Sequence, residues 1–458
     1  MPLEGALSPN NCEADRRKKG GHMKKACFFI VVLMLAGLFA VSCGKKQASE
    51  IKVGVVQAQT GMYAAFGQGD VFGIKAAVDD INKDGGVKVG DKKIPIKLVI
   101  VDNESDPNKA GSLAESLIVQ DKVNFIVSGD EPPPMHPGVS QAAEKHKVIY
   151  VTCTGPEEPW AAMRQETPTK WQYTWATGLF AIVSPPAAGD FRNKPGYTIV
   201  DTWMAMLDLF GGKTNKKVGI ICSDDPDGHG WYQLFGPALK KAGYEVIGLD
   251  KNLGLVPLET TDFSSTIKAW KDAKVDILWG NCPGPFFGAV WKQATALGFK
   301  PKMVSIGRGA LYYEDISAWG DDLPMGICTE VWWDPSMKDS PGFGSTTPAS
   351  LAERWATEKK QPLNRAIGPG YRSIQVLVDA IQRAGSLDSE KVNAALAQTD
   401  LPTICQRVKF DENHFNRGPL FFGQWFKTDA PEKWDLKIVF SKHDFVTATA
   451  QPVFPKPY

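Results

Sequence analysis

Short apolar runs alternate with segments of helical periodicity along most of the chain, and this alternation constrains the fold more than any other feature. In the first half the predicted strands are 51–56, 94–101, 123–128 and 148–152. The segment after the first of them has apolar residues at helical spacing, at Ile74, Val78 and Ile81. Strands that alternate with helices in this way are typical of βαβ units and a parallel sheet.

A second series of the same kind follows an irregular segment, 155–197, which is rich in Trp and Pro. Its predicted strands are 218–222, 244–249, 275–279 and 303–306, with helical patterns at 231–242, 263–273 and 286–297. The sequence therefore predicts an α/β fold with two doubly wound parallel-sheet lobes around a cleft. In open sheets of this class, ligands bind in the loops at the carboxyl ends of the strands.

The N-terminal region has the pattern of an exported protein. A basic start at Met23-Lys24-Lys25 precedes an almost wholly apolar segment, 26–41. This segment is shorter than the ~20 residues that a membrane-spanning helix needs. A basic start followed by a short apolar run is typical of a signal peptide. We therefore expect 1–42 to be an upstream extension and signal peptide.

A cysteine stands directly after that apolar segment. The stretch AVSC, 40–43, resembles the lipobox of bacterial lipoproteins. This resemblance implies that the Cys43 thiol is acylated and that 43–50 is a tether between the lipid anchor and the first strand. The alternative is an ordinary signal peptide with an incidental cysteine.

Composition excludes several classes of function. The formal net charge is +1 and the basic residues are dispersed, so we expect no nucleic-acid partner. Apart from 26–41 no apolar run approaches membrane-spanning length, so membrane contact is expected through the lipid anchor only. The cysteines form no CxxC pair, the acidic segment 224–229 lacks the order of an EF-hand, and nucleotide-binding and hydrolase motifs are missing. We expect no enzyme activity, no cofactor and no metal.

Three segments resemble a known family. They read IKVGVVQAQTGMYAAFGQGDVFGIKAAVDDINKDGGV, VDNESDPNKAGSLAESLI and DFSSTIKAWKDAKVDIL. They are similar to the type I periplasmic solute-binding proteins, of the leucine/isoleucine/valine ABC transporter type, and the similarity covers about 51–440. It implies two lobes joined by three chain crossings, with lobe one at 51–178 and 333–409 and lobe two at 179–332 and 410–458.

The resemblance also implies a function. The chain would be a lipid-anchored extracytoplasmic solute-binding protein of an ABC importer, at the periplasmic face of the cell membrane or on the cell surface. We expect a monomer whose partners are a small-molecule solute, held in the interlobe cleft, and an inner-membrane ABC permease. The alternative is a sensory or regulatory solute-binding module of the same fold that signals to a membrane partner.

In this family a loop of the first lobe holds the carboxylate of an amino-acid solute, and here that loop reads SGDEPPPMHPG, 128–138. The three prolines, 132–134, have no N–H to donate. Asp130 and Glu131 repel a carboxylate. We expect both acids to contact the solute.

Other contacts are implied for the first lobe. The family's next contact loop falls at VTCTGPEEP, 151–159, where Thr152, Thr154 and the N–H of Gly155 can donate hydrogen bonds. An aromatic residue that stacks on the solute corresponds to Phe66. Three tryptophans that flank predicted cleft loops are further candidates for the pocket wall: Trp160, Trp175 and Trp279.

In the second lobe the pattern departs from the family. Asp227 stands where the family offers an aromatic residue. The acid that the family places for the solute ammonium falls in SIGRGAL, at Gly307 or Arg308, and neither residue is acidic. A guanidinium is a planar fork that matches a carboxylate, so we expect Arg308 to bind an anionic group. The predicted solute is a branched-chain amino acid or, because of these departures, a related small organic acid or amide with an apolar body.

Overall fold

The computed structural model describes residues 49–179, 189–320 and 322–458. Internal contacts separate Met1–Ser49 from a second unit, Glu50–Tyr458, and the account that follows concerns this second unit. The predicted extension, the signal peptide and Cys43 lie outside the described residues. None of the helices in the described ranges combines the length and apolar character that crossing a bilayer requires.

The first sheet is five-stranded and wholly parallel, with the order β4-β1-β5-β6-β7. Its strands are β1 (Ile51–Gln57), β4 (Ile96–Asp102), β5 (Phe125–Asp130), β6 (Tyr150–Cys153) and β7 (Thr174–Ala176). β1 lies between β4 and β5, since Val53 is paired with Leu98 on one side and with Phe125 on the other.

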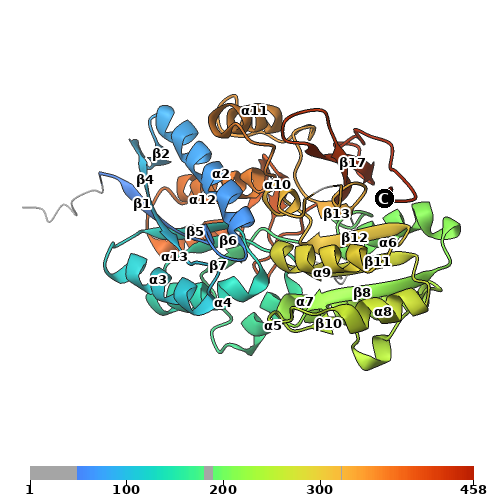
Figure 1. The fold of residues 1–458 in the computed structure, drawn as a ribbon. Helices are drawn as coiled ribbons and strands as arrows, with labels where there is room; N and C mark the ends of the chain where they lie inside the picture. Colours follow the sequence, from blue (N-terminus) through green and yellow to red (C-terminus); the bar gives the residue numbers. More distant parts are fainter. Residues whose placement is uncertain (1–48, 180–188, 321) are drawn as a thin grey trace, which may run out of the picture. The chain divides into compact units, whose positions relative to one another are not determined.

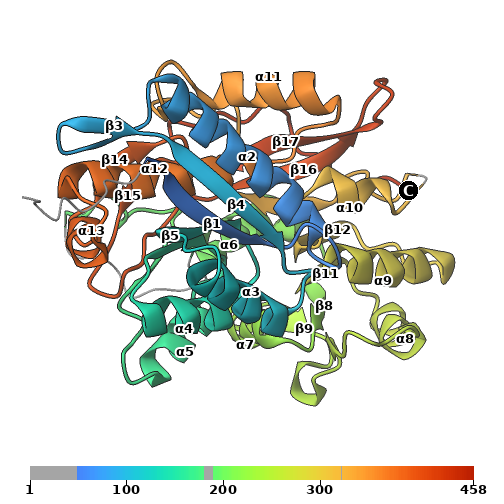
Figure 2. The same ribbon diagram turned by 90° about the vertical axis from the view of Figure 1, so that its left-hand side faces the viewer.

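Helices cover both faces of the first sheet (Figure 1). On one face lie α2 (Ala64–Lys83) and α12 (Ile367–Ala384), which pack against each other although they are far apart in sequence (Figure 2). On the other face lie α3 (Pro107–Val119) and α4 (His136–His146). Because side chains alternate along a strand, Val55 of β1 joins the core under α2 and α12, whereas Val56 joins the core under α3 and α4.

The second sheet has eight strands in the part of the chain that the structure describes, with β10-β8-β11-β12-β13-β16-β17 in order and β9 beside β8. The strands from β8 to β13 are parallel, and β16 and β17 are antiparallel additions. They are β8 (Lys217–Ser223), β9 (Glu245–Val246), β10 (Leu255–Val256), β11 (Ile277–Cys282), β12 (Met303–Arg308), β13 (Cys328–Val331), β16 (Phe421–Lys427) and β17 (Trp434–Ser441).

Helices also cover both faces of the second sheet (Figure 1). α6 (Ile199–Phe210) and α7 (Pro226–Lys241) share a core with Ile220 and Trp279. α8 (Ser264–Asp272) and α9 (Gly284–Ala296) share a core with Ile221 and Leu278. The remaining elements are β2 (Val87–Val89), β3 (Lys92–Ile94), η1 (Pro133–Met135), α5 (Glu158–Glu166), η2 (Gly211–Lys213), η3 (Leu249–Lys251), α10 (Tyr313–Ser317), α11 (Pro348–Lys359), α13 (Ser389–Leu396), β14 (Asp400–Thr403) and β15 (Gln406–Lys409).

The predicted α/β class with two parallel, helix-covered sheets is confirmed. One predicted strand, 244–249, is wrong in extent, because β9 ends at Val246 and a 3-10 turn follows. Gly248 takes a left-handed φ of 70° there, a conformation that stops a strand and that glycine adopts without strain. The proposed lobe boundaries at 178, 332 and 409 stay predictions.

Candidate functional site

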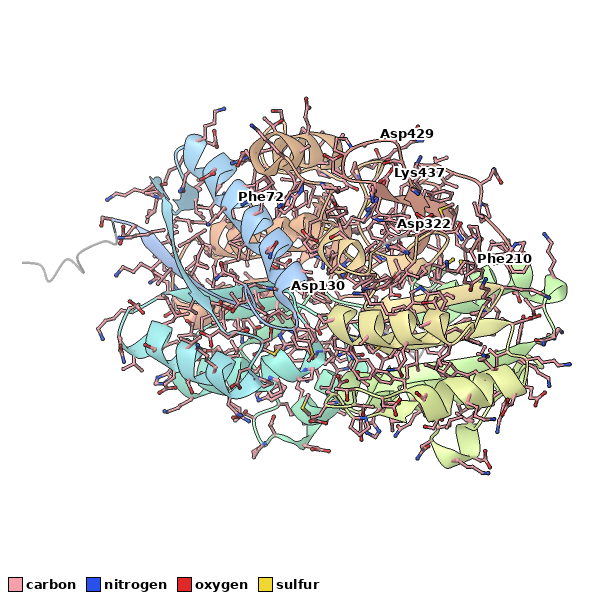
Figure 3. All side chains as sticks on the ribbon, in the orientation of Figure 1. Phe72, Asp130, Phe210, Asp322, Asp429 and Lys437 are labelled. Atoms are coloured by element: carbon pink, nitrogen blue, oxygen red, sulfur yellow. The ribbon has the colours of Figure 1, made fainter. Side chains whose placement is uncertain are left out.

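The carboxyl ends of strands from both sheets meet at one set of buried polar side chains. β5 ends at Asp130, β8 at Ser223 and β12 at Arg308. Asp130 lies near the boundary between the elements of the two sheets (Figure 3). Loops that follow the strands of open α/β sheets form ligand sites, so this is the candidate site.

The space enclosed there is small. A cavity of about 10 Å³ lies between the two sheets, close to the smallest volume that holds one water molecule. First-sheet elements contribute Phe66, Asp130, Glu131 and Gly155 to its wall, and second-sheet elements contribute Trp231, Asn281, Arg308, Glu330 and Trp332. In this conformation the site is closed and has no room for a solute the size of an amino acid.

Arg308 lies in this wall and is paired with carboxylates of its own chain. Its Nη2 is 3.0 Å from Asp225 Oδ2, and its Nη1 is 3.2 Å from Asp227 Oδ2. Nη2 also donates to the hydroxyl of Ser223. The sequence-based interpretation treated the Arg308 charge as free for an anionic solute group. The structure instead matches this charge with two carboxylates.

Local sequence explains how those carboxylates are held. Asp225 caps the N-terminus of α7 and accepts a hydrogen bond of 2.8 Å from the Gly228 N–H, and Pro226 stands at the first helical position. Asp followed by Pro is a strong helix start. Asp227, in the first turn, accepts a hydrogen bond of 2.9 Å from Asn281 Nδ2. The β8–α7 turn therefore presents both carboxylates to Arg308.

Burial and the neighbouring charges both act on the ionisation of Asp227 and Arg308. Burial raises the pKa of Asp227 to about 7, although the Arg308 guanidinium opposes the shift. For Arg308, burial alone would lower the pKa, but Asp225 and Asp227 outweigh it and raise the pKa above its ordinary value. Arg308 is thus a permanent cation, with more negative than positive charge around it.

Asp130 lies on the opposite side of the cavity and is also buried. Burial raises its pKa to about 7, while a hydrogen bond from Tyr312 and the Arg372 guanidinium act in the opposite direction. The Tyr312 hydroxyl donates to Asp130 Oδ2 at 3.2 Å. This bond connects the end of β5 to the segment that follows β12.

Glu131 has a structural use as well as a place in the cavity wall. Its Oε1 accepts hydrogen bonds from the Ala58 N–H and, at 3.1 Å, from Asn103 Nδ2. Burial raises the pKa of Glu131 to about 8, and those two donors oppose the shift. Glu131 therefore ties the loop after β1 to the end of β5, a role that its sequence position did not indicate.

The predicted donors of the first lobe are mostly engaged within the protein. The Thr154 hydroxyl donates to the Glu131 carbonyl at 2.7 Å, and the Thr152 hydroxyl is 2.7 Å from that of Ser128. Neither threonine is part of the cavity wall, whereas Gly155 is. The contact of Thr152 and Thr154 with a solute therefore stays a prediction.

The aromatic wall differs in part from the one predicted. Phe66 lines the cavity and makes an edge-to-face contact with Tyr312, with 4.8 Å between ring centroids. The three tryptophans chosen from sequence lie in cores instead. Trp160 stacks on Trp171, Trp175 on His414, and Trp279 packs against Trp203.

Sequence reasoning missed four residues of the second-sheet wall: Trp231, Asn281, Glu330 and Trp332. Two of them pack closely against Gly307: a Cβ at this position would meet the Trp231 ring at 2.9 Å and Glu330 Oε1 at 3.0 Å. Glycine at this position therefore lets an indole and a carboxylate reach the end of β12. Asn281 lies two residues after the predicted strand 275–279 and within the observed β11, so the underestimated length of this strand hid it.

No group of three or more side chains in the described ranges has the arrangement of a metal site. The five cysteines described there are Cys153, Cys222, Cys282, Cys328 and Cys405, all buried and unpaired. Burial raises the pKa of the Cys222 thiol to about 12, so this side chain behaves as a small apolar residue.

Comparison with known proteins agrees with this architecture. The chain is 27% identical to the Leu/Ile/Val-binding protein of Citrobacter freundii over 273 residues, which are 59% of this chain and 65% of that protein. The chain thus covers slightly less than two thirds of that relative. It is 23% identical to the leucine-specific-binding protein of Salmonella typhimurium over 385 residues, which are 83% of this chain and 92% of the relative.

Two solved structures share the fold. A leucine-binding protein from Thermotoga maritima superposes with a TM-score of 0.65 at 20% identity, over 86% of this chain and 99% of that one. A solute-binding protein of an ABC transporter from Rhodopseudomonas palustris, in complex with 3,4-dihydroxybenzoic acid, gives a TM-score of 0.64 at 20% identity, over 88% and 99%.

These relatives are binding proteins, which supports the prediction that the chain is not an enzyme. The fold of type I periplasmic binding proteins, predicted from the three sequence segments, is confirmed by both structural neighbours. The family model described as periplasmic binding protein matches residues 50–430, so the chain belongs to the periplasmic binding protein family.

Proposed function

We propose that the chain is a lipid-anchored extracytoplasmic protein that captures a small solute between its two sheets and delivers it to an inner-membrane ABC permease. The observation that carries the proposal is the convergence of the ends of β5, β8, β11 and β12 on one set of buried polar side chains. Family membership supports solute binding. The lipobox-like AVSC at 40–43 supports the anchor.

The chemistry of the site bears on the class of solute. The names of the relatives suggest leucine, isoleucine or valine as the solute. The departures of this sequence from the family pattern suggested a small organic acid or amide instead. Acceptor groups predominate in the cavity wall, in Asp130, Asn281 and Glu330. Such a wall favours a solute that brings N–H donors, as an ammonium group or an amide does, over a plain organic acid.

Binding requires a change of conformation. Because the enclosed cavity is about 10 Å³, a solute enters only after the two sheets have moved apart. Hinged opening and closure around a ligand is how two-lobed binding proteins work. We infer that the described conformation is a closed one.

The test is a thermal-shift screen of the purified protein against amino acids, amides, amines and organic acids, followed by calorimetric titration of the hits. A solute at 100 times its Kd should add about 2.7 kcal/mol to the free energy of unfolding. We expect the solute to be recovered chemically unchanged. Conversion of the solute, or a panel without a single binder, contradicts the proposal.

A further inference from the structure

Two acceptor atoms in the cavity wall have no partner within the protein. Glu330 Oε2 and Asn281 Oδ1 are buried and make no hydrogen bond, and both residues line the cavity. The Trp203 indole lies near Glu330 and favours its ionised form, but no hydrogen bond within 3.5 Å forms between them. Buried acceptors without partners are costly, so these atoms point to a solute that donates.

The charge of the main donor group in the wall, in contrast, is already balanced within the protein. The Arg308 guanidinium is paired with Asp225 and Asp227. Arg308 Nε and Nη1 make no hydrogen bond with described residues, although Nη1 lies 3.2 Å from Asp227 Oδ2. Arg308 can donate from Nε to a neutral oxygen. Its positive charge is not available to a carboxylate, because two carboxylates already surround it.

The charges around the cavity are unbalanced. Three carboxyl groups, of Asp130, Glu131 and Glu330, are in the wall, and the two carboxylates paired with Arg308 lie directly behind it. The described cations that act on these acids are two guanidinium groups, of Arg308 and Arg372. Acids thus outnumber cations by five to two. Burial raises the pKa of four of these acids to about 7 or 8, so a solute cation favours their ionised forms whereas an anion opposes them.

Aromatic faces complete the wall. Phe66, Trp231 and Trp332 all line the cavity, and Trp231 is fixed by stacking on Phe235 at 4.5 Å between centroids. Aromatic faces attract cations, tryptophan most strongly. Carboxylates together with indole and phenyl rings are the surroundings that suit an ammonium group.

We propose that the solute of this site is an organic ammonium cation without a carboxylate, held between the Glu330 carboxylate, the Asn281 amide oxygen and the aromatic wall. This inference rests on the proposed function, since it names the class of solute that the same cleft takes. It assigns Glu330 as a specificity-determining residue, a position to which sequence reasoning gave no role.

The experiment compares solutes that differ only in their charged groups. One series is leucine, 3-methylbutylamine and 4-methylpentanoate, and the other is phenylalanine, 2-phenylethylamine and 3-phenylpropanoate. Each compound is titrated calorimetrically into the full protein. We expect at least one amine to bind tenfold or more tightly than the amino acid of its series, and neither carboxylate to bind. Binding of a carboxylate more tightly than its amine overturns the inference.

Variants identify the residues responsible. Glu330→Gln keeps the shape and removes the charge, so amine binding should weaken by at least tenfold. The matched control is Glu314→Gln, because Glu314 Oε2 is also buried without a partner but the residue is not in the cavity wall. Equal amine affinity in wild type and Glu330→Gln contradicts the assignment.

A second variant tests the same site independently, in case Glu330→Gln does not fold. Trp332→Leu keeps an apolar side chain at a partly buried position of the wall and removes the π face. We expect about tenfold weaker binding of the amine, and an unchanged affinity overturns the aromatic contribution. If the wider screen finds only neutral or anionic binders, the solute class is wrong and the proposed function stands. If nothing binds, both fail.

Discussion

The Tyr312 hydroxyl donates a hydrogen bond of 3.2 Å to Asp130 Oδ2, and this bond joins the end of a first-sheet strand to the segment after a second-sheet strand. Tyr312 also makes an edge-to-face contact with Phe66. Both of these contacts form between the two sheets. The contacts of the Tyr312 side chain therefore indicate whether the cleft is closed.

Removing this hydroxyl should change the ionisation of Asp130. The hydrogen bond favours the carboxylate and holds the pKa of Asp130 below the value that burial alone would give; it stands at about 7. We expect Tyr312→Phe to raise the pKa of Asp130, as measured by carbon NMR of the labelled carboxyl group. Tyr313→Phe is the control, since the Tyr313 hydroxyl donates to the Glu432 carbonyl instead. An unchanged Asp130 titration would show that the contact is not made in solution.

Arg308→Ala should strongly destabilise the protein, because it leaves Asp225 and Asp227 buried without a cation. Breaking a buried ion pair by removing one partner costs about 3–5 kcal/mol. Urea denaturation measures this loss. The control is Arg354→Ala, whose side chain is partly exposed among Asp79, Asp80 and Glu358 and should cost about 0–1 kcal/mol. A loss below about 1 kcal/mol for Arg308→Ala contradicts the buried triad.

Stability should fall as the pH rises from about 4 to about 8. Burial raises the pKa of Asp130, Asp227 and Glu330 to about 7 and that of Glu131 to about 8. Through these four acids the folded protein binds more protons than the unfolded chain, so each added pH unit lowers the free energy of unfolding. Burial lowers the pKa of His136, His414 and His443, and these three act in the opposite direction below about pH 6.5. The stabilisation is fully present only below the ordinary carboxyl pKa values.

Urea denaturation of the solute-free protein at pH 5 and pH 8 checks this dependence. We expect a decrease of at least about 1 kcal/mol per pH unit, since one proton difference corresponds to ~1.4 kcal/mol per pH unit. Glu330→Gln should flatten the dependence, whereas Glu314→Gln should leave the cavity contribution in place. Stability that rises over this range would contradict the burial of these acids.

Cys43→Ser should release the protein from the membrane. The prediction rests on the lipobox-like AVSC at 40–43, because serine lacks the thiol that is acylated. Fractionation of cells that express wild type and variant, followed by immunoblotting, measures the distribution. We expect wild type in the membrane fraction and the variant in the soluble extracytoplasmic fraction. A wild type that is already soluble after export removes the lipid anchor from the proposed function.

Much of the fold could be predicted from local sequence. Apolar runs of β-branched residues predicted the strands, as at 51–56, which is β1 (Ile51–Gln57) in the structure. The start of α3 has a local cause of the same kind, since Asp106 accepts hydrogen bonds from the N–H groups of Asn108 and Lys109. These signals are local because strand alternation and helix capping depend on neighbouring residues only. Parallel topology followed, since alternating strands and helices leave few other arrangements.

The candidate site was only partly predictable. The family resemblance implied solute contacts at Phe66, Asp130, Glu131, Gly155 and Arg308, and these five residues line the cavity. Asp227 was placed nearby, but its role as a partner of Arg308 was not foreseen. The two residues are 81 positions apart and on different strand-end loops, and no local pattern reports such a distance.

The sequence by itself determined which residues form strands and helices and which loops gather at the strand ends. Only the tertiary structure decided that Arg308 is neutralised by Asp225 and Asp227, and that Glu330, on a strand far along the chain, brings an unpartnered carboxylate oxygen to the cavity. The physical reason is the separation along the chain of the residues that interact. Secondary structure follows from contacts within a few residues, whereas the charge balance of a buried site is a sum over side chains that meet only after the sheets have packed.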